Sequence, residues 1–512
     1  MPPGLAIDPI LGVVVAITAA VLLWNVFLAG QIAQLRAAPP LFRGISGLVG
    51  LLLAPALLVH LLGASIVTGR AIAAVQWLWP AVLVLFVLQA TYATARRLVT
   101  PFLGVPILVY DVFVAAAALV RWSEAHGWTV PTWAWAIPAA ESAVLGITSG
   151  GLALTSSYAL AMPILSPAYP ARWRLSKSVR VALALYAAGA AAVLALEAVR
   201  GARAVTSYAQ YDAEPLRERA PSDFAIGLRV LPSLGDAPPA MALRYDLALA
   251  DSAGVRTLLV RLTPEGARFA ALDSLARALE GRRSDSTVLV VALAYDAAER
   301  DARHRDAAEW RADRLADVDR IVRRLRPDIL LPAEDPYGSG ERTLGRISPR
   351  DWASWITAAA QRSKRLRPRT RIGVAAARFD VADSLLFAWA ASPGSPVDVL
   401  GLTLLPSFGG AVSLNARMRA ADRWLATAPG DKPVWVFAAG GYPVAHGQRS
   451  QARAIWGTLV WASSHERIKG VVVADAGDYD SMTGLRAPGG RVRPAAAVMS
   501  RAIRSLRENE GQ

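Results

Sequence analysis

Carboxylates gather at the ends of apolar runs in the second half of the chain. Glu334 and Asp335 directly follow the letters ILLPA, and Asp380, Asp475 and Asp478 follow two later runs. A pair of carboxyl groups can cleave a glycosidic bond, with separations of roughly 5–5.5 Å in retaining enzymes and roughly 6.5–9.5 Å in inverting ones. Two adjacent carboxylates after an apolar run are hard to explain by packing. Glu334 and Asp335 are therefore candidate catalytic carboxylates, and Asp475 is a weaker catalytic candidate.

Basic and aromatic residues near the same run ends could bind a ligand, since aromatic rings present a large apolar face with a polar edge. The candidate ligand-binding residues are Arg261, Tyr337, Asp380, Trp435, Tyr442, Asp478 and Tyr479. Structural roles stay open for several of them. Arg261 could pair with a neighbouring carboxylate, and Trp435 lies within an apolar run, which is more typical of a core residue. The stretch ADAGDYDSMTG could form an ordinary Gly/Asp turn.

Eight short apolar runs are the elements that would position these residues. They span residues 224–232, 256–262, 287–295, 328–335, 371–379, 397–405, 433–440 and 469–477. Helical patterns separate them, and one of these, SPRDWASWITAAAQRSKRL, begins with Ser348 as a candidate N-cap and has Asp351 three residues on. Apolar strands that alternate with helices predict a parallel sheet covered on both faces. Eight such units predict a (β/α)8 TIM barrel, whose chemistry lies at the carboxyl ends of its strands.

The second half of the chain also resembles a known superfamily. Five of its motifs resemble strands two, four, six, seven and eight of the retaining (β/α)8 glycoside hydrolases of the cellulase, β-glucanase and arabinogalactanase superfamily. In that order they are DLALADSAGVRTLLVRL, PDILLPAEDPYG, VDVLGLTLLPSF, KPVWVFAAGGYP and GVVVADAGDYDSMTGLRAPGGRVRPAAAVM. The resemblance covers roughly half of the chain. It implies an acid/base near Glu334 or Asp335 and a sugar-binding role for Arg261.

Two departures from the superfamily bear on catalysis. The fourth-strand motif is ambiguous, because anchoring on Pro336 selects Asp335 as the acid/base and anchoring on residue type selects Glu334. Adjacent strand residues point to opposite faces, so we expect only one of them to face the barrel mouth. In the seventh-strand motif the nucleophilic glutamate is replaced by Ala438 or Ala439. The resemblance therefore implies the fold without the retaining mechanism.

The first half of the chain is typical of a membrane domain. Six stretches approach the roughly 20 apolar residues that a spanning helix needs. They cover residues 10–30, 45–68, 72–95, 102–120, 133–154 and 181–199. Arginine and lysine concentrate in the loops after the first, third and fifth stretches, which predicts that these loops are cytoplasmic. We therefore expect an integral inner-membrane protein with its C-terminal domain on the periplasmic or extracellular side.

Three ionisable residues fall within these stretches: His60, Asp111 and Glu141. Charges are costly in a bilayer, so each is a candidate functional residue, and the alternative is that they pair with one another or with backbone inside the bundle. Six helices exceed what anchoring requires. A membrane-protein partner of the bundle is therefore a further expectation.

Composition excludes several classes of function. The chain has no cysteine and five scattered histidines, which argues against thiolate chemistry and a metal site. Its net charge of +15 invites nucleic-acid binding, but the arginines are scattered over helical faces without a recognition motif, so we expect no nucleic-acid partner. No cofactor is expected either.

The sequence therefore predicts a polytopic bundle over residues 1–200, a linker over 201–222 and a glycosidase-like TIM barrel over 223–512. The favoured function is a catalytically degenerate barrel that binds or organises an envelope or extracellular polysaccharide. One alternative is an active membrane-tethered glycosidase that uses Glu334 or Asp335. Another is a transporter or complex-assembly subunit with an accessory barrel. Fold alone does not choose between these functions.

Overall fold

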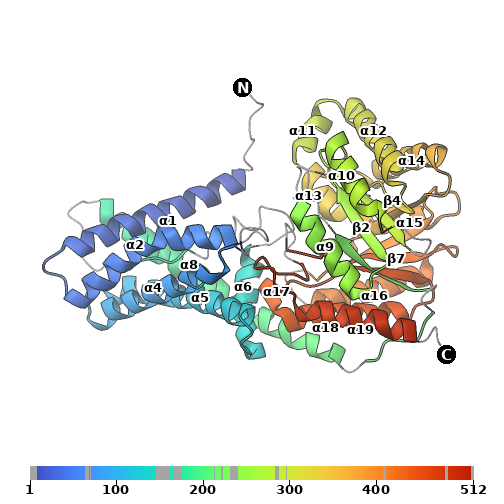
Figure 1. Cartoon of the computed structure of the whole chain (residues 1–512). Coiled ribbons are helices and arrows are strands. Elements are labelled where there is room, and N and C mark those ends of the chain that lie inside the picture. Colours follow the sequence, from blue (N-terminus) through green and yellow to red (C-terminus); the bar gives the residue numbers. More distant parts are fainter. Residues whose placement is uncertain are drawn as a thin grey trace.

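The chain folds into a bundle of helices joined end-on to a closed barrel (Figure 1). The structure is a computed structural model, and it describes residues 9–63, 69, 71–145, 162–165, 175–212, 214–220, 223–230, 240–282, 287–295, 297–406, 411–478 and 483–508. The order of the two parts along the chain is the predicted one.

Long apolar helices make up the first part. They are α1 (Pro9–Gln34), α2 (Pro40–Gly63), α4 (Leu78–Ala95) after the short η1 (Ala73–Val75), α5 (Pro101–Ala125), α6 (Ala136–Leu145) after η2 (Thr132–Trp135), and α8 (Leu175–Ser207), which continues into η3 (Tyr208–Asp212). Within the described residues, five helices are long and apolar enough to cross a membrane. Their outer faces expose large apolar side chains such as Leu51, Phe102 and Leu196. A soluble protein rarely exposes so many, so this part is a membrane domain.

Two predictions about this part differ from the structure. The predicted fifth span, residues 133–154, begins as η2 and the ten-residue α6, and its remainder lies outside the described residues. The predicted linker begins too early, because α8 runs on to Ser207 and η3 follows it. Tyr208 and Tyr211 are buried there in the main core of the barrel. This packing orders the segment, although its polar composition alone predicts an extended linker.

The second part is a closed barrel of eight parallel strands in the order of the chain. The strands are β1 (Ala225–Val230), β2 (Thr257–Leu262), β3 (Val288–Leu293), β4 (Ile329–Leu331), β5 (Arg371–Ala376), β6 (Val399–Leu404), β7 (Val434–Ala439) and β8 (Ile468–Val473). All eight predicted strands are present. The predicted (β/α)8 fold is therefore confirmed.

Helices surround the barrel. They are α9 (Ala240–Ala253), α10 (Phe269–Glu280), α11 (Ala297–Arg305), α12 (Ala307–Leu325), α13 (Glu341–Leu344) after the π-helical turn η4 (Pro336–Gly340), α14 (Pro349–Leu366), α15 (Val381–Ala391), α16 (Ala411–Thr427), α17 (Pro443–His446), α18 (Gln448–Ser463) and α19 (Pro494–Glu508). The predicted cap of α14 is confirmed, since Ser348 Oγ accepts a hydrogen bond from Asp351 N at 3.1 Å. Such a cap satisfies one of the free N–H groups of the first turn.

The strands separate two cores. One face of the strands packs against the helices in a continuous apolar cluster, and the other face fills the barrel with a smaller cluster. The inner cluster contains Leu259, Val290, Leu331, Trp435, Phe437 and Val472 among others. The barrel interior is therefore packed with side chains at this level, as in other barrels of this type.

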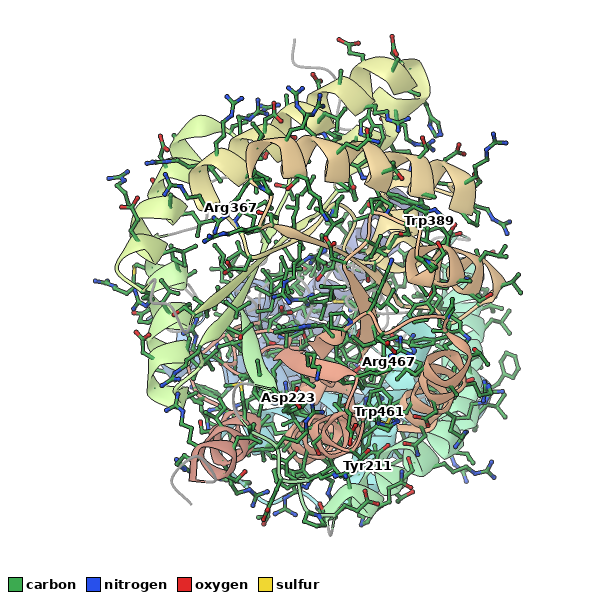
Figure 2. All side chains as sticks on the ribbon, turned by 90° about the vertical axis from the view of Figure 1, so that its right-hand side faces the viewer. Tyr211, Asp223, Arg367, Trp389, Trp461 and Arg467 are labelled. Carbon is green, nitrogen blue, oxygen red and sulfur yellow. The ribbon has the colours of Figure 1, made fainter. Side chains whose placement is uncertain are left out.

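The carboxyl ends of the strands face the membrane domain. The loop after β7 reaches the bundle through Val444, whose carbonyl accepts a hydrogen bond from Arg121 Nε at 3.0 Å. The N–H of Gln448 at the start of α18 donates to the Glu124 carboxylate at 3.1 and 3.2 Å. Figure 2 looks onto the opposite end of the barrel, where Asp223 and Arg467 precede β1 and β8.

Candidate functional site at the barrel mouth

Four charged side chains form a cluster at the inner face of the strand ends. Arg229 comes from β1, Arg261 from β2, Glu334 from the segment after β4, and Asp475 from the segment after β8. Arg229 Nη1 lies 2.9 Å from Glu334 Oε1, and Arg229 Nη2 lies 3.0 Å from Asp475 Oδ2. Arg261 Nε lies 2.6 Å from the other oxygen of Glu334. We call these four residues the mouth cluster.

Three residues of the mouth cluster are buried, Arg261 is partly exposed, and the four charges balance. Glu334 and Asp475 are 3% and 0% exposed, and Arg229 is 4% exposed. Asp475 also makes an ion pair with Arg229 Nε and accepts a hydrogen bond from Thr483 Oγ1 at 2.7 Å. Unpaired buried charges are costly, and pairing with hydrogen bonds offsets that cost. Both carboxylates are thus held by guanidinium groups.

The structure distinguishes the two adjacent carboxylates after β4. Glu334 faces the mouth cluster, whereas Asp335 makes a hydrogen bond with the Ser339 hydroxyl in the η4 turn. The Asp335 carbonyl also accepts from Gly338 N and Gly340 N at 2.9 and 3.2 Å. Asp335 therefore shapes the turn. Of the two carboxylates, Glu334 is the one that joins the mouth cluster.

Strand β7 supplies no carboxylate to this cluster. Ala438 and Ala439 are buried, and they lie opposite Thr403 and Leu404 of β6. Ala439 belongs to the core between strands and helices. Neither alanine can form a covalent glycosyl intermediate.

Most of the other predicted ligand-binding residues have structural contacts. Trp435 is 3% exposed and packs against Phe437 with ring centroids 6.1 Å apart inside the barrel. Tyr337 is buried in the outer core. Asp478 makes an ion pair with Arg493 at 2.5 Å and accepts from Gly484 N at 2.8 Å. These three hold the barrel and its last loop together and do not present a binding surface.

The remaining predicted residues of the barrel lie on its loops. Asp380 is the N-cap of α15 and accepts a hydrogen bond from Asp383 N at 3.0 Å. Tyr442 is half-buried at the start of α17. Tyr479 lies outside the described residues. Asp380 and Tyr442 therefore both have described, partly exposed side chains in the loops that follow the carboxyl ends of β5 and β7.

Asp383, which the sequence did not single out, is a titratable residue in the first turn of α15. Its Oδ2 accepts hydrogen bonds from the N–H groups of Ala377, Arg378 and Phe379 at 2.9, 2.6 and 2.9 Å. Burial raises the pKa of the Asp383 carboxyl to about 6, and these backbone bonds oppose the rise. The carboxylate thus ties the loop together at the cost of a buried charge.

This raised pKa predicts a pH effect on stability. The folded chain takes up a proton at Asp383 before the unfolded chain does, so its contribution to stability grows as pH falls through 6 and is lost as pH rises. Relative to Asp383→Asn, we expect the native chain to gain about 1 kcal/mol between pH 7 and pH 5. Thermal unfolding of both proteins in detergent at the two pH values measures this. Equal shifts in the two proteins would contradict the prediction.

The ionisable residues of the membrane domain have partners within it or at its end. Glu141 pairs with Arg121, and His60 stacks on Trp79 with ring centroids 4.9 Å apart. Asp111 Oδ1 accepts a hydrogen bond from Ile164 N at 2.9 Å. Asp111 thus contacts backbone inside the bundle, as the alternative predicted, whereas Glu141 pairs with an arginine of α5 and His60 stacks on a ring. A transport role for these residues therefore stays a prediction.

Asn25 is a further polar residue of the bundle that the sequence reading missed. Its side chain donates to Pro163 O at 2.7 Å and accepts from Leu165 N at 2.9 Å. Asn25 and Asp111 thus hold a short non-helical segment, residues 162–165, within the bundle. Such backbone is tolerated at membrane depth only where protein covers it. An asparagine inside a long apolar helix was the available signal.

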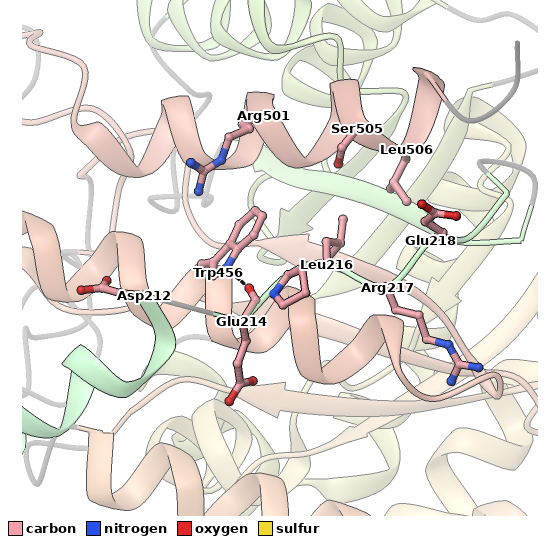
Figure 3. Close-up of a pocket in the computed structure, with 10 residues that line it drawn as sticks. Asp212, Glu214, Leu216, Arg217, Glu218, Trp456, Arg501, Ser505 and Leu506 are labelled. Carbon is pink, nitrogen blue, oxygen red and sulfur yellow. Dashed lines mark hydrogen bonds between the residues drawn. The ribbon is translucent and has the colours of Figure 1, made fainter. Parts of the chain in front are cut away.

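A surface pocket lies on the side of the barrel (Figure 3). Its lining includes Trp456 of α18, Arg501 of α19, Asp212 and residues 214–218. Arg501 covers the Trp456 ring at 4.5 Å, and Trp456 Nε1 donates to Glu214 O at 2.8 Å. The ring is therefore already occupied by protein, and the pocket is separate from the mouth cluster. Among the described residues, no group of three or more potential ligands could hold a metal ion.

The comparisons with known proteins find similar solved structures but no relatives by sequence. No family model matches the chain, and no curated protein matches its sequence. A GH5_18 protein from Bifidobacterium longum subsp. longum is 13% identical over 56% of this chain and 80% of its own, with a TM-score of 0.45. A GH5_18 variant from Streptomyces cattleya, solved with Manb1-4GlcNAc, is 16% identical over 55% of this chain and 81% of its own, also at 0.45.

A third similar structure is a β-glucuronidase from Ruminococcus gnavus, solved with D-glucuronic acid. It is 9% identical over 56% of this chain, with a TM-score of 0.40, and the match spans about half of its length, 52%. All three are glycoside hydrolases by their descriptions. At these identities the similarity is one of fold, and the second part of this chain is a closed (β/α)8 barrel.

Proposed function

We propose that this chain is a membrane-anchored protein whose glycosidase-like barrel binds a saccharide without hydrolysing it. The observation that carries the proposal is Arg229, which bridges Glu334 and Asp475 inside the mouth. An acid catalyst must give its proton to the leaving oxygen, and a nucleophile or base must be free to approach the sugar or a water. Carboxylates locked between guanidinium groups are poorly suited to either task. The alanines of β7 supply no substitute.

The bundle supports a location of the barrel outside the cytoplasm. The turn between α1 and α2 and the turn between α4 and α5 lie at the end of the bundle remote from the barrel (Figure 1). These turns carry Arg36, Arg43, Arg96 and Arg97. Positive charge near helix ends favours the cytoplasmic side. The barrel then lies on the periplasmic or extracellular side of an inner membrane, where it would bind or organise an envelope or extracellular polysaccharide.

The test is a saccharide screen of the full-length protein in detergent. Bacterial and plant polysaccharides are assayed for retention on immobilised protein and for release of reducing ends. We expect retention of at least one glycan without release. Asp335→Asn is the matched control, because Asp335 lies next to Glu334 and its carboxylate bonds to the Ser339 hydroxyl of the η4 turn.

Two results would oppose the proposal. Release of reducing ends that Glu334→Gln abolishes and Asp335→Asn preserves would show an active glycosidase. Absence of retention for every glycan, with a folded protein, would remove the binding role. In that case the bundle would be the place to look for function.

A further inference from the structure

The end of the barrel that carries the mouth cluster is the end joined to the bundle. Besides the loop after β7, the loop after β8 touches the bundle, where Arg491 Nη1 donates to Glu124 O at 3.3 Å. Gly447 lies against the Trp135 ring. Glu124 and Trp135 belong to the barrel-side ends of α5 and to η2. Since α5 is long and apolar enough to span a membrane, its end marks the level of the bilayer surface.

Exposed large apolar side chains on the barrel gather at the same end. Among its described residues they are Met241, Val381, Leu385 and Val492, which are 44%, 76%, 57% and 50% exposed. Met241 and Val381 open α9 and α15, Leu385 lies one turn into α15, and Val492 follows the loop that touches Glu124. The amino end of each of these helices follows the carboxyl end of a strand. All four therefore lie around the mouth.

The opposite end of the barrel has a different surface. Exposed residues in the loops before β2, β5, β7 and β8 include Arg256, Arg369, Asp431 and Glu466. No large apolar side chain is exposed in the described part of these loops. The exposed apolar side chains thus lie at the end of the barrel that faces the bundle. Single exposed apolar residues scattered at random would not produce this difference between the two ends.

We propose that the mouth rim, defined by Met241, Val381, Leu385 and Val492, rests on the bilayer surface, and that the saccharide of this barrel is carried by a membrane lipid. The rim continues the contact between barrel and bundle, so the partner that fits it is the headgroup layer of the same bilayer. Apolar side chains gain free energy when this layer covers them. A sugar attached to a lipid reaches the mouth by diffusion in the membrane plane, whereas a soluble polymer must enter between rim and headgroups.

The position of the rim can be tested with single cysteines, because the natural chain has none. A bimane fluorophore is placed on Val381→Cys, Leu385→Cys or Val492→Cys in the full chain, reconstituted in phosphatidylcholine–phosphatidylglycerol vesicles. Arg369→Cys and Asp431→Cys are controls on the remote end. We expect a phosphatidylcholine with a nitroxide on its headgroup to quench the rim labels several-fold more than the controls.

Three outcomes would overturn the rim contact. Equal quenching at both ends would show that the barrel does not rest on the bilayer. Quenching at Val492 alone would limit the contact to the bundle junction. In detergent without lipid, the label at Leu385 could become better protected from quenching as the protein concentration rises. That result would assign the rim to a contact with a second copy of the chain.

The proposal that the saccharide is lipid-borne rests on the proposed function. The following test distinguishes the failure of this proposal from the failure of saccharide binding itself. The oligosaccharides retained in the screen are compared as free sugars and as phosphatidylethanolamine-linked neoglycolipids in the same vesicles as the protein. We expect the lipid-linked form to bind several-fold more tightly. Equal affinity would overturn the lipid-borne ligand and leave saccharide binding intact. No binding in either form would overturn the proposed function, while the quenching result would still decide the rim contact.

Discussion

Replacing Arg229 with methionine is expected to lower the free energy of unfolding by about 3–5 kcal/mol, the range for breaking a buried ion pair from one side. Arg229 pairs with two buried carboxylates at once, so its loss removes a cationic partner from both Asp475 and Glu334. Thermal unfolding of the full chain in detergent should show the midpoint falling by roughly 5–10 °C. A matched control is Arg282→Met, because Arg282 pairs with Asp251 on the surface.

A second variant separates charge from packing. In Arg229→Met with Asp475→Leu, Glu334 keeps its contact with Arg261, so only one carboxylate loses a partner and no isolated charge remains at Asp475. We expect this double variant to recover more than half of the lost stability, because neutral replacement of a buried ion pair is often tolerated. If Arg229→Met is as mild as Arg282→Met, the mouth cluster is open to water, and the argument against catalysis by Glu334 fails with it.

The strands of the barrel were predictable because each is an apolar run bounded by polar residues, and a strand buried on both faces needs such a run. The fourth strand shows the limit of this signal. Its run extended to Asp335, but β4 ends at Leu331 because Pro332 has no N–H to donate to a neighbouring strand. Glu334 was identified as one of two alternatives. Choosing between them required the actual direction of the chain after the proline.

Arg229 was not identified, although a charged residue inside an apolar strand is a visible signal. Its partners come from segments more than a hundred residues away, and no local pattern encodes that pairing. The contact between the barrel and the bundle could not be predicted from the sequence for the same reason. The apolar stretches predict both parts separately, whereas their contact depends on a few positions such as Gly447 and Trp135. This contact decides which end of the barrel faces the membrane.

Replacing Gly447 with alanine is expected to destabilise the chain by about 3–5 kcal/mol, from backbone strain and overpacking together. Gly447 has φ +92° and ψ +154°, a region that residues with a side chain avoid. A Cβ at this position would also lie 2.9–3.1 Å from atoms of the Trp135 ring of the membrane domain. The ring is buried and cannot move freely. The thermal midpoint of the full chain and protease cleavage near α17 measure the effect.

The controls separate the two causes. Gly430→Ala also places a side chain at positive φ, since Gly430 has φ +79°, but the nearest atom to its Cβ would be Ala391 O at an ordinary 3.9 Å. We expect it to cost about 1–2 kcal/mol, a backbone contribution alone. When Gly447→Ala is added to Trp135→Ala, its additional cost should fall toward a backbone contribution, because the ring that its Cβ would meet is gone. If Gly447→Ala equals Gly430→Ala, the Trp135 ring does not press on the loop after β7. The mouth would then be free to turn away from the membrane domain, and a lipid-borne ligand would lose its structural basis.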